Sequence, residues 1–201
     1  MARIMILNGS PRAPRSNSKK YAALFAQACP AETVYREITR GNHGTLCREI
    51  EGFSDLLLVF PLYADGIPVT LLRFLKALEA APPSPRLTVS MMVNCGFLEP
   101  GQNDIAVEMV RLFCEKSGCR FGSVLEIGSG EAILETPFAG MVRRKIGKLA
   151  DSIARGTHRS WKVTMPLPKR WFIRASTAYW ESYGKRNGVT KEQMATMEIE
   201  K

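Results

Sequence analysis

Hydroxyl, amide and guanidinium side chains are concentrated between residues 8 and 20, directly after a short apolar run. The segment from residue 8 to residue 18 reads NGSPRAPRSNS and leads into a helical pattern. A helix N-terminus offers free N–H groups and partial positive charge, and arginine can bind a phosphate through two parallel hydrogen bonds. Charge-assisted hydrogen bonds contribute about 1.5–3 kcal/mol each, so three or four of them could hold a dianion without a metal. The predicted anion-binding residues are the side-chain donors Ser10, Ser16, Asn17 and Ser18, with Arg12 and Arg15 as fixed positive charges.

This loop matches neither of the two best-known phosphate-binding motifs. It lacks G-x-x-x-x-G-K-[ST], which argues against a nucleotide triphosphatase, and it lacks G-x-G-x-x-G, which argues against a dinucleotide bound in the Rossmann manner. The segment 128–130 reads GSG without a third glycine at the required spacing, and we interpret it as a turn. The alternative for the first loop is an ordinary helix cap by Ser16 or Ser18, with Arg12 and Arg15 solvated.

Two later segments follow apolar runs and suit a flat aromatic ligand. Residues 61–68 read PLYADGIP, so Tyr63 could pack on a ring and backbone groups could bond its polar edge; the alternative is a plain connection with Tyr63 covering the core. Residues 94–97 read NCGF, where Gly96 permits close backbone approach. No histidine or basic residue lies near Cys95 in sequence, which indicates a buried thiol and not a nucleophile.

The period of the apolar residues alternates between strand and helix along most of the chain. Strands are expected at Arg3–Asn8, Thr33–Ile38, Asp55–Pro61, Leu87–Asn94 and Phe121–Ile127. Helical patterns lie at residues 18–28, 68–81, 102–117 and 137–156, with a weaker one within residues 39–54. Five strands alternating with helices predict an α/β fold with a doubly wound parallel sheet, for which the common five-strand order is 2-1-3-4-5. Ligands of such sheets bind beyond the carboxyl ends of the strands, here after strands one, three and four.

Residues 157–201 lie outside this alternation and contain all three tryptophans, Trp161, Trp171 and Trp180. We expect an extended piece up to Pro168, a helix to Tyr183 and a last short helix from Thr190, where Thr190 and Gln193 match a capping box. Two regions are therefore predicted, a ligand-binding domain of residues 1–156 and an aromatic, basic helical extension of residues 157–201. The extension could cover the pocket, form a subunit interface or pack on its own domain.

Composition excludes several classes of protein. The 201 residues are 45% hydrophobic and 23% charged, as in a soluble globular protein, and the start of the chain shows neither a signal peptide nor a membrane span, so we expect a cytoplasmic protein without membrane insertion. Five scattered cysteines without a C-x-x-C pair disfavour a metal site or a disulfide framework. Net charge is +9, with five bases and no acid in residues 1–20, but no nucleic-acid motif accompanies it, so nucleic-acid binding is the least favoured function.

The motif G-S-P-R-x-x-x-S-N-S after the first strand, with P-L-Y-A-D-G-I-P after the third, resembles the flavodoxin-like NAD(P)H-dependent FMN reductases. The segment 184–191, GKRNGVTK, is also similar to bacterial members of that family. The resemblance implies a flavodoxin-like fold and an FMN phosphate bound by Ser10, Arg12, Ser16, Asn17 and Ser18. It implies a flavin ring and ribityl chain lined by Pro61, Leu62, Tyr63, Ala64 and Asp65. It places Asn94, Cys95 and Gly96 against the other side of the flavin.

The same resemblance implies an activity. Hydride would pass from NAD(P)H through FMN to a small acceptor such as a quinone, free flavin or nitro compound, with no catalytic side chain and with a homodimer as the assembly. The chain departs from related iron–sulfur flavoproteins, since only Cys47 lies where they carry a cysteine cluster, and from electron-carrier flavodoxins, since it is basic and lacks T-x-T-G-x-T. The alternative function is a non-catalytic FMN-binding electron carrier that serves a partner protein.

Overall fold

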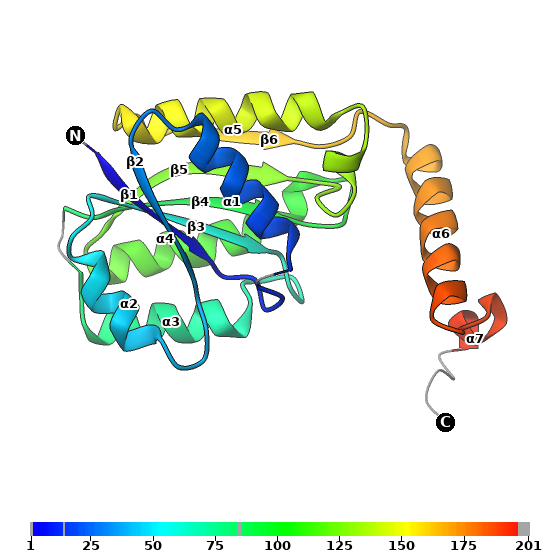
Figure 1. The fold of residues 1–201 in the computed structure, drawn as a ribbon, viewed down its shortest axis with the longest axis horizontal. Helices are drawn as coiled ribbons and strands as arrows, with labels where there is room; N and C mark the ends of the chain where they lie inside the picture. Colours follow the sequence, from blue (N-terminus) through cyan, green and yellow to red (C-terminus); the bar gives the residue numbers. More distant parts are fainter. Residues whose placement is uncertain (1, 14, 84–85, 197–201) are drawn as a thin grey trace. The chain divides into compact units, whose positions relative to one another are not determined.

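The structure is a computed structural model that describes residues 2–13, 15–83 and 86–196. Within them the chain forms a parallel sheet of order β2-β1-β3-β4-β5-β6 (Figure 1). The strands are β1 (Arg3–Asn8), β2 (Glu32–Glu37), β3 (Asp55–Pro61), β4 (Thr88–Asn94), β5 (Arg120–Ile127) and β6 (Ser160–Val163). The helices are α1 (Asn17–Ala28), α2 (His43–Ile50), α3 (Val69–Ala80), α4 (Asp104–Ser117), α5 (Ala139–Ala154), α6 (Lys169–Arg186) and α7 (Lys191–Thr196), with short 3-10 helices at Pro100–Asn103 and Ile133–Glu135.

The prediction of a five-stranded sheet of order 2-1-3-4-5 is wrong in one respect, because a sixth strand extends the sheet. Strand β6 pairs in parallel with β5, from Val124 opposite Ser160 to Ile127 opposite Val163. It was expected to be part of the extension, outside the sheet. Only Val163 of its four residues is buried, so it carries no apolar run that would indicate a strand. The strand forms because the edge of β5 offers unpaired backbone N–H and C=O groups for hydrogen bonding.

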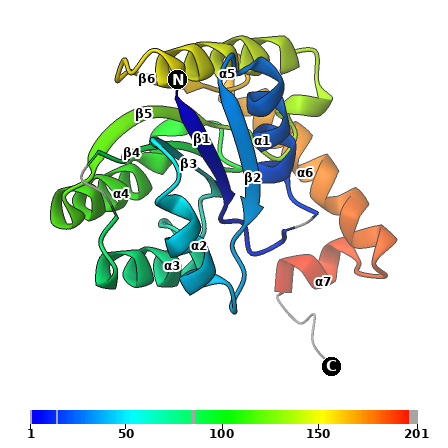
Figure 2. The same cartoon turned by 60° about the vertical axis from the view of Figure 1, so that its left-hand side comes forward.

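The central strands are covered on both faces, as the continuous apolar run of residues 56–60 predicts. All five of these side chains are at most 1% exposed. Helices α1 and α5 lie on one face of the sheet, and α2, α3 and α4 lie on the other (Figure 1 and Figure 2). The prediction of a doubly wound α/β sheet is therefore confirmed, and the carboxyl ends of the strands meet at one edge.

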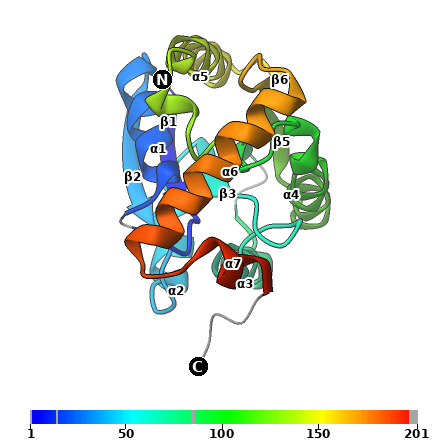
Figure 3. The same ribbon diagram turned by 90° about the vertical axis from the view of Figure 1, so that its right-hand side faces the viewer.

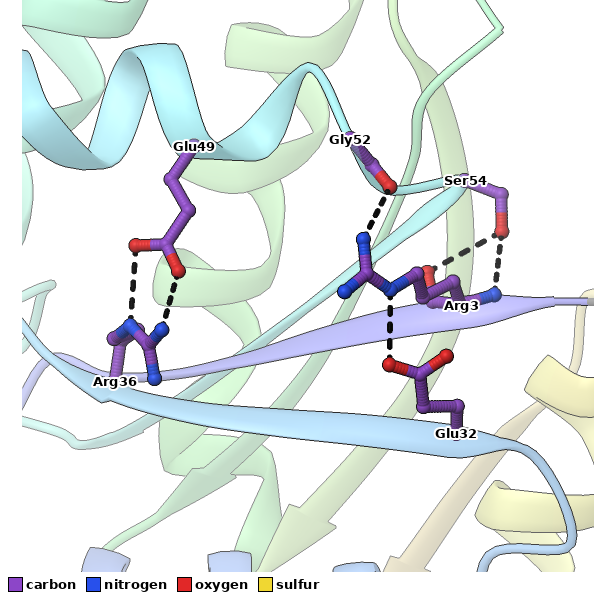
Figure 4. A network of polar contacts seen from close by, with 6 residues as sticks. All are labelled: Arg3, Glu32, Arg36, Glu49, Gly52 and Ser54. Atoms are coloured by element: carbon purple, nitrogen blue, oxygen red, sulfur yellow. Dashed lines mark hydrogen bonds and ion pairs between the residues drawn. The ribbon is translucent and has the colours of Figure 1, made fainter.

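A network of polar contacts joins the first two strands to the segment that precedes β3 (Figure 4). Arg3 Nε donates to Glu32 Oε1 at 3.0 Å, and the backbone N–H of Arg3 donates to Ser54 Oγ at 3.0 Å. Further along β2, the Arg36 guanidinium donates to both carboxylate oxygens of Glu49 in α2. Exposed ion pairs of this kind contribute at most about 1 kcal/mol each. Their main effect here is positional, since they tie α2 to β2.

The chain divides into two compact units, Met1–Met165 and Pro166–Lys201. In the second unit, α7 folds back on the end of α6 (Figure 3). The chain passes close to Gly184, where a Cβ would lie 3.2 Å from Val189 O and 2.6 Å from Sδ of the flexible Met194 side chain. The capping box is confirmed: Thr190 N–H donates to Gln193 Oε1 at 2.8 Å, and Gln193 N–H donates to Thr190 Oγ1 at 3.2 Å. No helix in the described parts of the chain combines the length and the hydropathy needed to cross a membrane.

Candidate functional site

A cavity of about 690 Å³ opens at the carboxyl edge of the sheet, within the 300–1,000 Å³ typical of small-molecule sites. In the sheet, β2 lies on one side of β1, and β3 to β6 follow one another on the other side. The strand order therefore reverses between β1 and β3. The loops after these two strands form the cavity, which is where the topology predicts a ligand. Its lining residues are Ser10, Pro11, Arg12, Arg15, Ser16, Asn17, Ser18, Lys19, Lys20, Ala23, Pro61, Leu62, Tyr63, Asn94 and Glu131.

The first loop is shaped by a buried amide. Asn8, the last residue of β1, is 0% exposed. Its Oδ1 accepts the N–H of Ser10 at 2.9 Å, and its Nδ2 donates to Ser16 Oγ at 3.3 Å and to Tyr35 Oη at 2.9 Å. Two backbone bonds complete the loop, from Ala13 N–H to Ser10 O and from Arg15 N–H to Arg12 O. Asn8 therefore links both ends of the loop to β2.

Three serine hydroxyls in this loop accept hydrogen bonds without donating one to any described residue. Ser10 Oγ accepts from Arg12 N–H at 3.3 Å, and Ser16 Oγ accepts from Lys19 N–H at 3.2 Å as well as from Asn8. Ser18 Oγ accepts from Asn94 Nδ2 at 3.3 Å. A hydroxyl has one proton to donate, so all three protons are free for an acceptor. A phosphate has only acceptor oxygens in its dianionic form, and it fits such a donor set.

Ser16 can cap the helix and bind an anion at the same time, because its hydroxyl oxygen accepts the capping hydrogen bond while its proton stays free to donate. Ser16 is the N-cap of α1, with φ −131° and ψ 154°, and it satisfies the N–H of Lys19. The N–H groups of Asn17 and Ser18 precede any partner within the helix, so they add two further donors at the positive end of the helix dipole. Asn17 itself donates through Nδ2 to Glu131 O at 3.2 Å.

The charges around the cavity are unequally neutralised. Lys19 pairs with Glu37 at 3.3 Å and Lys20 with Glu135 at 3.1 Å. In contrast, Arg12 and Arg15 make no ion pair with any carboxylate in the described residues, and both are exposed. These two guanidiniums leave a surplus of positive charge on the loop, which electrostatically favours an anion.

The loop after β3 presents an aromatic ring at the cavity. Tyr63 is 61% exposed, so it does not cover the core. Its N–H and C=O exchange hydrogen bonds with Gly66 at 3.0 and 3.1 Å, closing a tight turn. Ala64 and Asp65 at the tip have φ values of 47° and 57°, as in a type I′ turn, a conformation that costs an alanine about 1–2 kcal/mol. Neither Ala64 nor Asp65 lines the cavity.

The loop after β4 contributes one predicted residue to the cavity wall. Asn94 lines it and bridges to the strands, donating from Nδ2 to Phe60 O at 3.0 Å. Cys95 is only 4% exposed, burial raises the pKa of its thiol, and the residue does not line the cavity. Gly96 also lies outside the lining, next to the Glu131 side chain. The buried thiol expected at Cys95 is therefore confirmed.

The loop after β5 is a turn, as expected, and it buttresses the cavity. Gly130 N–H donates to Cys95 O at 2.7 Å, and a Cβ at Gly130 would lie 2.8 Å from Asn94 Cβ. Gly130 O accepts the hydroxyl of Tyr21, which is fully buried, and burial raises the pKa of that phenol. The next residue, Glu131, adds a carboxylate to the lining that no sequence signal indicated.

Sequence reasoning also missed Asn8 and Tyr35, which position the first loop. Burial, with a smaller contribution from Glu37, raises the pKa of Tyr35 to about 12, so its hydroxyl stays protonated and donates to Glu37 Oε1 at 3.0 Å. A polar residue closing an apolar strand was the available signal for Asn8. Tyr35 gave no comparable signal, because its role depends on the pairing of β1 with β2.

Glu126 is a buried titratable residue near the carboxyl end of β5. The Glu126 side chain is 5% exposed, and Lys162 Nζ lies 3.3 Å from its Oε2 without hydrogen-bonding geometry. Burial, followed by the hydrogen bond with Asp104, raises the pKa of Glu126 to about 7. Lys162 also bonds Asp104 and lowers the pKa of that carboxyl. The three groups tie β6 to β5 and to the start of α4.

No protein-family model matches the chain, and no curated protein sequence is significantly similar to it. Its fold does match solved structures. An FMN-dependent NADH-azoreductase from Bacillus anthracis str. Ames Ancestor, in complex with FMN, matches with a TM-score of 0.60 and 12% identity, over 76% of this chain and 99% of that one. A flavodoxin from Streptococcus pneumoniae TIGR4 matches with a TM-score of 0.58 and 11% identity, over 78% of this chain and 100% of that one. The chain has the flavodoxin-like fold.

A third flavodoxin-like structure, an NADPH-quinone reductase from P. pentosaceus, matches with a TM-score of 0.57 and 15% identity, over 75% of this chain and 98% of that one. These matches support, at the level of the fold, the resemblance that the two loop motifs indicate. The flavodoxin-like fold places the motif loops side by side, and the cavity described above lies between them.

Proposed function

We propose that the chain binds FMN in this cavity and transfers hydride from NAD(P)H through the flavin to a small acceptor such as a quinone, free flavin or nitro compound. One observation supports the proposal above all others: three serine protons and two guanidiniums without a partner among the described residues surround a helix N-terminus at the point where strand order reverses. That donor set suits the phosphate of a mononucleotide. The flavodoxin-like neighbour solved with FMN supports the same choice of ligand.

In this proposal the first loop holds the phosphate and the next two loops hold the ring. Ser10, Ser16 and Ser18 donate their hydroxyl protons, Arg12 neutralises charge, and Asn17 contributes its backbone N–H. The remaining residues proposed to contact the flavin are Pro61, Leu62, Tyr63, Ala64, Asp65, Asn94, Cys95 and Gly96. When bound, FMN supplies the redox chemistry, because the isoalloxazine accepts a hydride and releases electrons to a second substrate.

The protein's own part is to bind, orient and desolvate. In the loop after β3, Leu62 N–H donates to Asn94 O at 2.7 Å, and the N–H groups of Tyr63 and Gly66 are paired within the turn. The N–H groups of Ala64 and Asp65 therefore remain to bond the polar edge of the ring. The exposed Tyr63 ring provides a surface for packing. No acid–base side chain is required, and we assign no catalytic residue.

The wider setting follows from the same proposal. The FMN-binding residues all lie within residues 1–156, to which β6 adds the edge strand of the same sheet, the assembly is a homodimer, and the protein is cytoplasmic. These three statements rest on the resemblance to flavodoxin-like NAD(P)H-dependent FMN reductases. Sedimentation of the purified protein tests the second of them, since a monomer at all accessible concentrations contradicts it.

The first test is the visible spectrum of the purified protein before and after adding FMN, followed by NADPH. We expect visible flavin absorbance that NADPH bleaches, because the flavin accepts the hydride. Steady-state oxidation of NAD(P)H with a quinone then separates enzyme from carrier. A protein that holds FMN and never accepts a hydride would be the electron carrier, and hydride transfer would be refuted.

The second test removes the phosphate contacts. Arg12→Ala with Ser16→Ala removes two charge-assisted hydrogen-bond donors, each contributing about 1.5–3 kcal/mol, so FMN affinity should fall at least about a hundredfold. Arg144→Ala is the matched control, since Arg144 is an exposed arginine in α5 that does not line the cavity. Ser16→Ala alone measures the cost of the lost helix cap. Unchanged FMN affinity in the double variant would overturn the assignment of the loop.

A further inference from the structure

A second, smaller cavity lies between the first turns of α2 and α3. Its volume is about 190 Å³, and its lining residues are Arg40, His43, Val69, Thr70 and Arg73. One water occupies about 30 Å³ of liquid, so this space admits a phosphate-sized group. Because α2 follows the carboxyl end of β2 and α3 follows that of β3, the cavity lies at the same edge of the sheet as the first.

The lining of this cavity carries positive charge that no carboxylate of the lining neutralises. Arg40 and Arg73 form no ion pair with a carboxylate anywhere in the described chain, and no carboxylate lines the cavity. The third nitrogen-bearing side chain is His43, whose Nε2 is buried and lacks a hydrogen-bond partner among the described residues. The imidazole packs edge-on against Phe74, with ring centroids 6.1 Å apart. The two guanidiniums, which no carboxylate of the described residues neutralises, are the groups of the lining that favour an anion.

The backbone adds donors of the same kind. The N-cap of α2 is Asn42 and that of α3 is Pro68, and neither accepts a hydrogen bond from its helix through a side chain. The N–H groups of Val69 and Thr70, in the first turn of α3, thus have no side-chain cap, and both residues line the cavity. Two helix N-termini meet at the cavity, and each favours negative charge.

The cavity walls are held in place by contacts outside the cavity. Asn42 Oδ1 accepts the N–H of Thr39 at 2.9 Å, and Asn42 Nδ2 donates to Glu37 O at 2.8 Å, which orders the turn that carries Arg40. The Arg36–Glu49 pair ties α2 to β2 (Figure 4). A site of this kind is organised before its ligand arrives, so less binding energy is lost in ordering it.

The second cavity adjoins the first loop through Leu71. A Cβ placed on Gly9 would lie 3.2 Å from Leu71 Cβ, so the first turn of α3 packs directly on the loop that follows β1. Thr70 and Arg73, on the same turn, line the second cavity, and Tyr63, six residues before Val69, lines the first. A ligand with two separated phosphate-bearing or aromatic parts could therefore address both.

We propose that this second cavity binds a phosphomonoester, the 2′-phosphate of NADPH, and so selects NADPH over NADH. The inference rests on the proposed function for the identity of the donor, but the anion site itself rests only on the geometry above. A monoester carries a charge of about −1.5 to −2, whereas each phosphate of the diphosphate bridge carries about −1. Two arginines that form no ion pair among the described residues suit the monoester better.

The binding test needs no catalysis. Calorimetry compares adenosine 2′,5′-bisphosphate with adenosine 5′-monophosphate on the full chain saturated with FMN, and also without FMN. We expect the bisphosphate to bind at least about tenfold more tightly, and Arg40→Gln with Arg73→Gln to abolish that preference. Arg48→Gln with Lys76→Gln is the matched control, because it also removes two positive charges, one from α2 and one from α3, but both residues lie outside the cavity. An unchanged preference in the Arg40/Arg73 variant would overturn the site.

Steady-state kinetics supply the second readout. The Arg40/Arg73 variant should raise KM for NADPH at least about tenfold and leave kcat and the KM for NADH unchanged. The two proposals fail separately. If the protein neither binds FMN nor oxidises NADPH yet prefers the bisphosphate, the proposed function fails and the anion site stands. If FMN is reduced equally well by NADH and NADPH and the bisphosphate shows no preference, the site fails and the proposed function stands.

Discussion

Replacing Asn8 with alanine tests whether a buried amide shapes the first loop. Three hydrogen bonds end on this side chain, at 2.9 Å from Ser10 N, 2.9 Å from Tyr35 Oη and 3.3 Å from Ser16 Oγ. A net contribution of about 0.5–1.5 kcal/mol each, least for the longest, amounts to about 2–3 kcal/mol. Alanine also leaves the N–H of Ser10 unpaired at a residue that is only 4% exposed. We therefore expect the free energy of unfolding to fall by about 2–3 kcal/mol.

The assay is urea denaturation of the flavin-free protein, followed by titration with FMN through flavin fluorescence. Without Asn8 the loop must be ordered by the ligand, so FMN affinity should fall about tenfold or more, which corresponds to about 1.4 kcal/mol or more. Ser123→Ala is the matched control. Ser123 is 1% exposed near the amino end of β5, and its hydroxyl bonds Ser152 Oγ at 2.8 Å and Thr157 O at 2.9 Å.

The control separates general destabilisation from loss of the site. Both variants should unfold at lower urea concentration, but only Asn8→Ala should weaken FMN binding. If the Asn8→Ala protein unfolds at the wild-type midpoint, the amide does not carry the energy assigned to it. Equal FMN affinity in the two variants would refute the role of Asn8 in shaping a phosphate-binding loop.

Three further predictions concern single positions. Ala64→Gly should raise the free energy of unfolding by about 0.5–1 kcal/mol in urea denaturation, because glycine relieves the φ of 47°, and a loss of stability would contradict this turn geometry. Tyr63→Ala should weaken FMN binding about three- to tenfold through the loss of ring packing while changing stability by less than about 0.5 kcal/mol, and unchanged affinity by fluorescence titration would remove Tyr63 from the site. The pKa of Glu126 in the folded protein is about 7, above the ordinary 4.5. The stability of the wild-type protein should therefore fall as pH rises from about 4.5 to 7, by up to about 1.4 kcal/mol per pH unit. Glu126→Gln should remove this contribution and make stability less dependent on pH. Urea midpoints at pH 5, 6 and 8 measure this, and parallel curves for the two proteins would contradict it.

The fold was predictable to a large extent because its central elements carry strong local signals. Strands β1 and β3 begin and end at the predicted residues, since each is an apolar run bounded by polar or turn residues. Helix α4 ends at Gly118, whose φ of 69° is the left-handed conformation that glycine adopts readily. Strand β6 was not predictable in the same way, because its stability depends on the edge of β5 and on the Lys162 contacts with Asp104 and Glu126.

The candidate site divides along a similar line. Nine of the predicted residues line one cavity, because the motif that predicts them sits directly after β1, β3 and β4, and parallel strands bring their carboxyl ends together. The other four lie beside that cavity, at the tip of the turn after β3 or behind Asn94. Which side of a loop faces a cavity depends on backbone dihedrals such as those of Ala64, and these are set by packing that no local pattern reports.

The amino-acid sequence by itself determined the alternation of strands and helices, the doubly wound class of fold and the loops in which phosphate-binding side chains gather. These features follow from the period of apolar residues and from helix-start and turn signals, which act over a few neighbouring positions. The tertiary structure alone decided that Asn8 joins Ser10, Ser16 and Tyr35, and that Arg40 and Arg73 line one cavity. Such groupings join residues tens of positions apart, and only the pairing of strands and the packing of helices on the sheet bring them within reach of a common ligand.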